Sequence, residues 1–482
     1  MVFTQIISRV LFLGFAGFFL FVGCKKKEDD FDLNASLSFS TDTIMFDTVF
    51  TTIGSSTEYF MIYNNSNKPV LISRIYLASG AASNFRMNVD GLTGFYLQDV
   101  EIGPNDSLWA FVEVTVDPNG GNTPMLITDS IVFETNGKIQ DIDLVAYGQD
   151  AYFIIANRHV EGLPPYRIIA GEGTDTTWTS DKPIVIYGFA VVDSAAVLRI
   201  NAGTKIYFHN NSGLWVYIGG RLEVNGSLGQ EVVFQGDRLE SSYSDIPGQW
   251  DRIWLNESPL SHKINFAIIR NGFIGLQTEP LANYGWSAKV EINNTIIENM
   301  SGAGVLSRSS QIASENLLVS NCQQYGLALT IGGDYQFTHA TVGNFWSGSV
   351  RTSPAVYFNN YFKDAKNTVY PNALLKADFV NCVFYGNIDN EFLPDSVSGA
   401  AFNFKADHCL IRTDITTSGS RFISVLKNVD PQFNNYYDGD YRLKNGSPAF
   451  GAGKATSVST DLNGDLRDAL NPTLGAFELP AS

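Results

Sequence analysis

Close to the end of a repeated region, three side chains that could move protons and hold an acid stand within six residues of one another. They are Asp407, His408 and Arg412. An imidazole changes its protonation near neutral pH, a neighbouring carboxylate can orient it, and a guanidinium can bind an acidic group. These three are the catalytic candidates. The alternative, which we favour, places His408 in a stack of polar side chains that satisfy one another's hydrogen bonds.

Four aromatic side chains form a second candidate site, for binding rather than catalysis. Tyr207, Trp215, Tyr217 and Trp254 lie in short segments whose pattern is typical of β-strands. Because side chains alternate between the two faces of a strand, these rings turn outward if their apolar neighbours turn inward. A row of exposed rings can stack on sugar rings. It can equally be the surface on which another domain of the same chain packs.

A calcium-binding pattern is present only in part. Asp461, Asn463 and Asp465 alternate as ligands of a calcium loop do, but Leu466 stands where an EF-hand has glycine. No set of histidines and acids has the spacing of a metal site. We therefore expect no metal and no other cofactor, with calcium at Asp461 as the alternative.

A seven-residue phrase recurs through residues 265–413 and predicts the architecture. Its starts are 28, 22, 23, 43 and 26 residues apart. Its copies are Asn265–Asn271, Asn293–Asn299, Glu315–Asn321, Thr338–Asn344, Asn381–Asn387 and Asp407–Thr413. Each copy is a short β-prone segment between turn residues, and no helical period fits it. Repeats of this length predict stacked units with one strand each, a solenoid of parallel strands.

The alignment of the copies makes predictions for single residues. The second position of the phrase is occupied by Asn294, Asn316, His339, Cys382 and His408. Cys382 and Cys409 fall at neighbouring positions of the phrase, so their side chains would face opposite sides of their strands. Besides Cys24 the chain has three cysteines, an odd number that predicts buried thiols rather than a disulfide framework. The 43-residue interval predicts an inserted coil packed on its neighbours.

Residues 37–150 carry short alternating strands at hairpin spacing, separated by turn signals such as Asn136-Gly137. This spacing predicts an antiparallel β-sandwich. The phrases FMIYNNSNKPVLISRI, VEIGPNDSLWAFVEVTVDP and DLVAYGQD resemble immunoglobulin-like domains of the ASPM-SPD2-Hydin type. The resemblance implies an adhesive or spacer module without catalytic residues.

Residues 151–180 are interpreted as a linker, and residues 181–429 as a single-stranded right-handed parallel β-helix. The phrase LRINAGTKIYF is followed by GRLEVNG and then by GQW. Their order and spacing resemble the first coils of bacterial right-handed β-helix proteins of the pectin lyase-like type. Residues 430–482 contain DPQF, GDYRL, GSPA, TDLNG and PTLGAFE in that order, which resembles the closing segment of many secreted β-helix proteins. We expect a polar C-terminal cap over the last open edge, in which Arg467 pairs with Glu478.

The N-terminus indicates export. Residues 1–23 have one positive charge, an apolar run too short for a membrane span and a small residue at the end, as a signal peptide does. Phe21-Val22-Gly23-Cys24 resembles a bacterial lipobox, which implies lipidation of Cys24. The charged tether 24–36 contains KKKEDD, which resembles the signal of Bacteroidetes-type lipoproteins for the outer face of the outer membrane. An ordinary signal peptide and a periplasm-facing anchor are the alternatives.

The sequence therefore predicts an exported, lipid-anchored, all-β protein whose partners are the membrane and a polysaccharide or surface protein. The net charge of −17 excludes nucleic acid. In the first hypothesis the β-helix is a non-catalytic surface module that binds glycan or a protein. In the second it is a polysaccharide lyase or glycoside hydrolase acting on an acidic polysaccharide. The Gly-His-Gly and Arg-Ile-Lys phrases of polygalacturonase-type hydrolases are absent.

Overall fold

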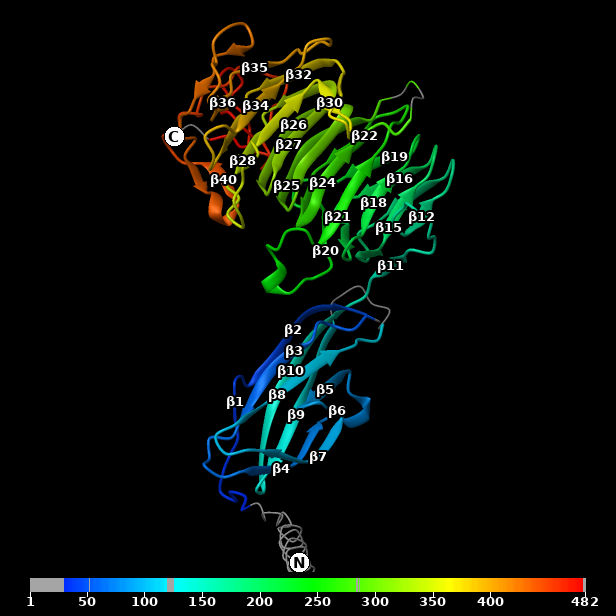
Figure 1. Ribbon diagram of the computed structural model, residues 1–482, viewed down its shortest axis with the longest axis vertical. Helices are drawn as coiled ribbons and strands as arrows, with labels where there is room; N and C mark the ends of the chain where they lie inside the picture. Colours follow the sequence, from blue (N-terminus) through cyan, green and yellow to red (C-terminus); the bar gives the residue numbers. More distant parts are fainter. Residues whose placement is uncertain (1–29, 52, 119–124, 283–284, 286, 480–482) are drawn as a thin grey trace, which may run out of the picture. The chain divides into compact units, whose positions relative to one another are not determined.

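The computed structural model describes residues 30–51, 53–118, 125–282, 285 and 287–479 (Figure 1). The chain divides into two compact units, the first of residues 1–117 and 125–148, the second of residues 118–124 and 149–482. The predicted signal peptide and the lipidation site Cys24 lie outside the described residues. Within the described ranges, no helix is long and apolar enough to cross a membrane.

The first unit consists of two antiparallel sheets that share one apolar core. The first sheet has the order β1 (Ser38–Phe39), β3 (Glu58–Tyr63), β8 (Ser107–Val114), β5 (Phe85–Val89) and β6 (Leu92–Gly94). The second has the order β2 (Thr43–Phe50), β10 (Lys138–Gln149), β9 (Met125–Thr135), β4 (Val70–Leu77) and β7 (Tyr96–Ile102). In the core, Phe60 from one sheet meets Phe133 from the other, and Phe85 meets Phe46. Alternation of buried and exposed residues along the strands produces this arrangement, as the sequence predicts.

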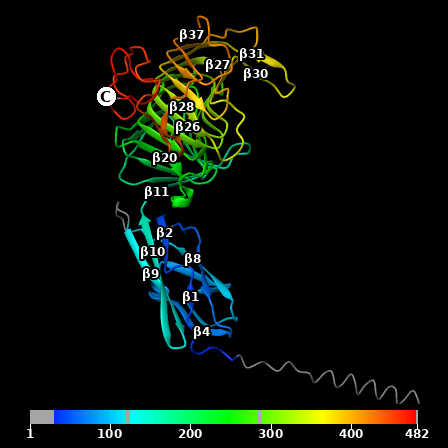
Figure 2. The same cartoon turned by 90° about the vertical axis from the view of Figure 1, so that its left-hand side faces the viewer.

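The second unit, which we call the solenoid, is a 26-stranded sheet in which most strands pair in parallel with the strand three places later. Twelve of its parallel strands go 320° round an axis. Figures 1 and 2 show the stacked coils from two sides. The side of the solenoid that carries the repeated phrase is called face 1. Its strands are β11 (Tyr152–Ile155), β14 (Ile184–Tyr187), β17 (Lys205–Phe208), β20 (Val232–Gly236), β23 (Ala267–Arg270), the second halves of β25 (Lys289–Met300) and β26 (Ala303–Cys322), β28 (Thr341–Asn344), β33 (Val383–Gly386), β36 (Leu410–Ile411) and β38 (Leu426–Lys427).

The other two sides complete each coil. One contains β12 (Tyr166–Ala170), β15 (Phe189–Val192), β18 (Gly213–Val216), β21 (Trp250–Leu255), β24 (Gly272–Thr278), part of β26, part of β27 (Tyr325–Thr338), β29 (Val356–Asn359) and β34 (Phe392–Asp395). The third contains β13 (Asp175–Trp178), β16 (Val197–Asn201), β19 (Arg221–Asn225), β22 (His262–Asn265), the remaining parts of β25, β26 and β27, β32 (Leu374–Val380), β35 (Lys405–Asp407) and β37 (Phe422–Ile423).

The prediction that residues 151–180 form a linker is wrong. Tyr152 of β11 pairs with Ile184 of β14, and Asp175 of β13 pairs with Val197 of β16. These strands are the first coil of the solenoid. Turn residues between them gave the segment the composition of a linker.

The repeated phrase marks the corners of face 1. Phe266, Asn294, Asn316, His339, Asn381 and His408 stand at one corner, each in the left-handed conformation with φ between 48° and 56°. Asparagine and histidine tolerate this conformation better than most residues do. The fifth copy is shifted by one residue from the predicted alignment, because Val380 pairs with Asp407. Asn381, not Cys382, therefore stacks in register with His408.

The same shift corrects the prediction for two cysteines. Val383 pairs with Leu410, so Cys382 and Cys409 are equivalent and point to the same side, into the core. The expectation that they face opposite sides is wrong. Cys322, Cys382 and Cys409 are all buried and unpaired, as predicted. Burial raises the pKa of the Cys322 thiol to about 12.

The 43-residue interval holds a regular coil with an addition. The strands β28, β29 and β32 continue the three sides of the solenoid. Between β29 and β32, an antiparallel hairpin of β30 (Tyr361–Lys363) and β31 (Val369–Pro371) projects from the coil (Figure 2). Phe362 and Tyr370 stack on it, with ring centroids 4.7 Å apart. The predicted inserted coil is thus a hairpin added to a complete coil.

The C-terminal segment packs along the outside of face 1. Its residues Phe433 and Leu474 form a second core with outward-facing Leu318, Val383 and Leu410. A short hairpin of β39 (Phe433–Asn435) and β40 (Asp440–Leu443), joined by the 3₁₀ turn Tyr436–Asp438, begins the segment. The predicted place of the cap, over the open end, is therefore wrong. Phe402 and Phe422, from the last coils, pack against the end of the main core instead.

The predicted pair of Arg467 and Glu478 is confirmed. Arg467 Nη1 lies 3.3 Å from Glu478 Oε2, with both side chains buried. The same guanidinium donates to Asn316 Oδ1 at 2.8 Å, so it ties the C-terminal segment to the corner ladder. Burial lowers the pKa of Arg467, and the nearby carboxylates of Glu478 and Asp461 oppose this effect.

A second buried ion pair stabilises the late coils. Arg351 and Glu391 have side chains that are 1% and 0% exposed, and Arg351 Nη1 donates to Glu391 Oε2 at 2.8 Å. The Glu391 carboxylate also accepts from the backbone N–H of Ala355 and Ile388. Loss of either partner leaves an uncompensated buried charge.

We predict that Arg351→Ala lowers the free energy of unfolding of the solenoid by about 3–5 kcal/mol. The matched control is Arg442→Ala, which breaks the exposed pair with Asp440 and should change stability little, because water and salt screen that pair. Urea denaturation followed by circular dichroism measures both variants. Equal losses of stability in the two variants would contradict the assignment.

Candidate functional site

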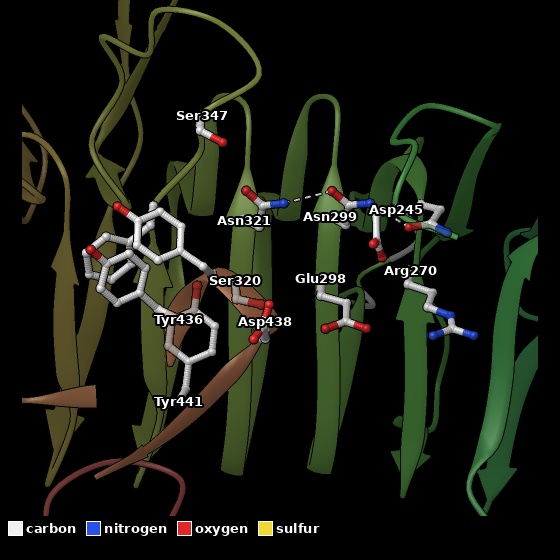
Figure 3. Close-up of a pocket in the computed structure, with 14 residues that line it drawn as sticks. Asp245, Arg270, Glu298, Asn299, Ser320, Asn321, Ser347, Tyr436, Asp438 and Tyr441 are labelled. Atoms are coloured by element: carbon white, nitrogen blue, oxygen red, sulfur yellow. Dashed lines mark hydrogen bonds between the residues drawn. The ribbon is translucent and has the colours of Figure 1, made fainter. Parts of the chain in front are cut away.

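A groove on face 1 is floored by three polar side chains from successive coils. Arg270 of β23 pairs with Glu298 of β25, and Glu298 pairs with Ser320 of β26. Each follows an inward-facing residue, Ile269 or its equivalent, and so points outward. Figure 3 shows the three side by side on adjacent strands. Parallel strands lie ~4.8 Å apart, so the three groups form one continuous row.

One wall of the groove is a ladder of amides. Asn299 Nδ2 donates to Asn271 Oδ1 at 2.7 Å, and Asn321 Nδ2 donates to Asn299 Oδ1 at 2.8 Å. All three asparagines have positive φ, at the corner that follows the face 1 strands. Beyond the ladder stands Asp245, on the loop after the 3₁₀ turn Ser241–Tyr243. Amides held in one orientation provide fixed donors and acceptors.

The opposite wall comes from the C-terminal segment. Tyr436, Tyr437 and Asp438 on the turn between β39 and β40 line the groove, together with Tyr441 of β40. The volume of the groove is about 470 Å³. This is the size range of sites that hold small molecules or a few sugar rings.

A glycine sets the place of this wall. Tyr441 packs on Gly343, and a Cβ at position 343 would lie 2.2 Å from the tyrosine ring. Phe345 stacks on Tyr436 with centroids 3.8 Å apart. Burial raises the pKa of Tyr441, so this hydroxyl stays protonated over the physiological range. The tyrosine wall is therefore fixed by direct packing on face 1.

Glu298 is the group best placed for chemistry. Its carboxylate accepts no hydrogen bond from any residue that the structure describes. Burial raises its pKa, the positive charge of Arg270 opposes the rise, and the negative charge of Asp245 adds to it. Arg270 itself donates from Nε to Gln235 Oε1 at 2.7 Å, which holds its guanidinium at the floor. A carboxyl group with a raised pKa is the kind of group that general acid–base catalysis uses.

Two of the sequence candidates for catalysis lie together at a different place. His408 Nδ1 is 2.8 Å from Asp407 Oδ1, and the buried Asp407 carboxylate also accepts from Lys454 Nζ at 2.6 Å and from Lys405. Burial would raise the pKa of Asp407, but the hydrogen bonds from Lys454, His408 and Lys405 hold it well below its usual range. Lys454 belongs to the C-terminal segment, so this cluster fastens that segment to the corner.

Arg412 is not brought to this cluster. Its guanidinium donates to Asp389 Oδ1 and to the carbonyl of Gly386, both at 2.8 Å, and lies over the ring of Tyr385. It stands at the other end of the face 1 strand from His408. A catalytic role for the three residues stays a prediction.

The four aromatic candidates face away from the main core but are largely covered. Trp215 stacks on Trp254 at 4.8 Å and meets Tyr217 edge-on, and only 5% of Trp215 is exposed. Trp215 Nε1 donates to Asn256 Oδ1 at 2.7 Å. Tyr207 is 7% exposed and belongs to the groove column, through Gln235 to Arg270. Ligand binding by these rings stays a prediction.

The residues of the partial calcium-binding pattern form a turn. Asp461 Oδ1 accepts from the backbone N–H groups of Asn463 and Asp465, and Oδ2 accepts from that of Glu478. Within the described part of the chain, no group of three or more histidines, cysteines or acids is arranged to hold a metal.

Sequence reasoning missed the groove. The column that contains Arg270 and Glu298 was visible as the sixth position of the repeated phrase, which is outward-facing and polar. The tyrosine wall had no comparable signal, because its position depends on how the C-terminal segment folds back.

Comparisons with known proteins identify no family. No protein-family model and no curated protein matches the sequence. Among solved structures, the chain is similar to a family 123 glycoside hydrolase from Clostridium perfringens at 11% identity and a TM-score of 0.17, over 23% of this chain and 26% of that one. It is similar to the periplasmic chaperone SfaE at 13% identity and 0.17, over 24% and 58%. It is also similar to an ASH/PapD-like domain of human CEP192, at 8% identity and 0.16, over 24% and 84%.

The chain thus spans about a quarter of the first of these proteins and little more than half of the second. Scores this low carry no argument about function.

The raised pKa of Glu298 predicts a pH effect on stability. The folded state binds this proton more tightly than the unfolded state does, so stability declines as pH rises above the ordinary pKa of a glutamate. In Glu298→Gln this cost is removed, so the variant should gain stability relative to the parent as pH rises above the ordinary pKa of a glutamate. Glu291→Gln, at a half-exposed outward position of the same strand, is the control. Parallel pH profiles of parent and Glu298→Gln would contradict the prediction.

Proposed function

We propose that the protein is an exported right-handed β-helix protein with an immunoglobulin-like spacer, and that its groove on face 1 binds a polysaccharide chain. The observation that carries the proposal is the composition of the groove: an amide ladder, a guanidinium, carboxyl groups and tyrosine rings along one row. Sugar hydroxyls pair with amides and charged groups, while sugar ring faces stack on aromatic side chains.

The charges of the groove favour a neutral glycan. Asp245, Glu298 and Asp438 contribute three acids, and Arg270 is the basic residue among the lining groups. A polyuronate would bring further negative charge to this surface, which costs binding energy. The chain as a whole is also acidic, with a net charge of −17.

Binding to polysaccharides tests the proposal. Arg270→Ala should weaken binding about tenfold or more, because it removes a charged donor from the floor. The control is Arg412→Ala, an arginine on the same outward column but held by Asp389 away from the groove. The measurement is affinity electrophoresis of the full chain in gels that contain dextran, β-glucan, polygalacturonate or alginate.

The neutral polymers should retard the parent and the control equally and Arg270→Ala less strongly. Equal retardation of all three proteins would overturn the groove assignment. Stronger retardation by polygalacturonate or alginate would overturn the choice of a neutral glycan and favour the acidic polysaccharide of the sequence hypothesis.

A second candidate function, cleavage of the bound glycan, is favoured by the state of Glu298. A carboxyl group with a raised pKa beside a second acid, Asp245, has the components of glycosidic acid–base catalysis. Glu298→Gln should then retain binding and lose cleavage by about a hundredfold or more. His408→Ala should leave cleavage unchanged. If His408→Ala abolishes cleavage and Glu298→Gln does not, the catalytic centre is the Asp407–His408 cluster instead.

Membrane attachment is proposed through lipidation of Cys24, from the lipobox-like FVGC. Two acyl signals provide stable anchoring, and the tether that follows is too polar to insert. Cells that express the protein and are labelled with a clickable palmitate analogue should label the parent and not Cys24→Ser, which should be released by washing. Label retained in Cys24→Ser would contradict the proposal. Protease access in intact cells distinguishes the cell surface from the periplasm.

A further inference from the structure

The first unit carries three exposed aromatic rings in contact on the outer face of one sheet. Tyr59 of β3 is 58% exposed, and Trp109 and Phe111 of β8 are 45% and 38% exposed. Tyr59 lies 5.1 Å from Trp109 between ring centroids, and Trp109 stacks on Phe111 with 15° between the rings. We call these three residues the aromatic platform.

Aromatic side chains this large are usually buried, so a cluster of three on the surface calls for a functional explanation. Tyr59 and Phe111 are directly paired across β3 and β8, and Trp109 is two residues along β8. Each therefore points to the same side of the sheet, opposite the core residues Phe60 and Ala110. Contiguous apolar surface of this kind marks a binding surface.

Polar groups border the platform on one side. A cavity of about 490 Å³ is lined by Phe111, Arg86, Asn88, Glu113 and Thr57, among others. Glu113 accepts from Thr57 Oγ1 at 2.6 Å, and Asn88 lies directly opposite Phe111 on β5. The buried amide oxygen of Asn88 has no donor among the described residues, a cost that a ligand donor could remove.

We propose that the aromatic platform and this cavity form a second glycan-binding site. A sugar ring has an apolar face of C–H groups and an edge of hydroxyls. The rings take the apolar face, and Asn88, Glu113 and Arg86 take the hydroxyls. The volume fits one or a few sugar units, whereas a protein partner requires a broader surface. The net charge of −17 argues against stacked nucleic-acid bases. This inference does not rest on the groove of the solenoid.

The full chain, run in gels that contain dextran or β-glucan, tests the proposal. Trp109→Ala and Tyr59→Ala should each weaken retardation about tenfold in the Arg270→Ala background, where the solenoid groove no longer contributes. The control is Tyr96→Ala, an exposed tyrosine on the other sheet of the same unit. Thermal melts check that the variants fold.

Loss of retardation in the two platform variants, with retardation kept in Tyr96→Ala, supports the site. The proposal is overturned if the platform variants run like the Arg270→Ala parent, or if neither polymer retards a protein with an intact platform. It is also overturned if sedimentation shows that the protein is a dimer and that Trp109→Ala is a monomer, since the platform then joins two copies of the chain. A failure of the groove alone would appear differently, as equal retardation of the wild type and Arg270→Ala.

Discussion

The structure of the second unit depends on a corner that the coils with the repeated phrase all turn in the same place. At this corner the backbone adopts the left-handed conformation, at Asn294, Asn316 and their equivalents. Side chains stack there: Asn316 Nδ2 donates to Asn294 Oδ1 at 2.9 Å. Most residues are disfavoured in the left-handed conformation, but asparagine tolerates it. A buried amide also needs a hydrogen-bond partner, and the asparagine of the next coil provides one. Burial lowers the pKa of His339 in this ladder to about 3, so the ring is neutral there.

A fixed corner keeps the outward columns in register. Arg270, Glu298 and Ser320 meet because each occupies the fourth position after its corner residue. The same register places apolar Leu318 and Val383 in a second outward column, which the C-terminal segment covers. The groove therefore lies at the edge of the surface that the C-terminal segment covers, along the polar column of Arg270, Glu298 and Ser320. The fold and the site share one constraint, and the C-terminal segment supplies both stability and the tyrosine wall.

The sequence predicts the repeats, the parallel solenoid, the antiparallel first unit and the pair of Arg467 with Glu478. These features depend on local patterns that recur or on motifs of fixed order. The one-residue error at Cys382 has a simple cause. Asn381 resembles the first residue of the phrase, whereas Val380, which occupies that position, resembles nothing in the other copies. The first coil was mistaken for a linker because its strands are short and its turns are rich in glycine and proline.

The groove could not be predicted from the sequence, for a different reason. Its floor comes from successive coils, but Asp245 comes from a loop and Tyr436 from a segment that folds back along face 1. Neither position follows from periodicity. His408 has a reactive side chain, although its left-handed backbone conformation is that of the corner asparagines. Residue type alone could not separate a corner residue from a catalytic one.

The most direct test of the account is a crystal structure of the full chain with a neutral oligosaccharide bound. The account predicts sugar density along Arg270, Glu298 and Asn299, with a ring against Tyr436. Density confined to the Trp215 and Trp254 side of the solenoid, or around Asp407 and His408, with an empty groove, would contradict it.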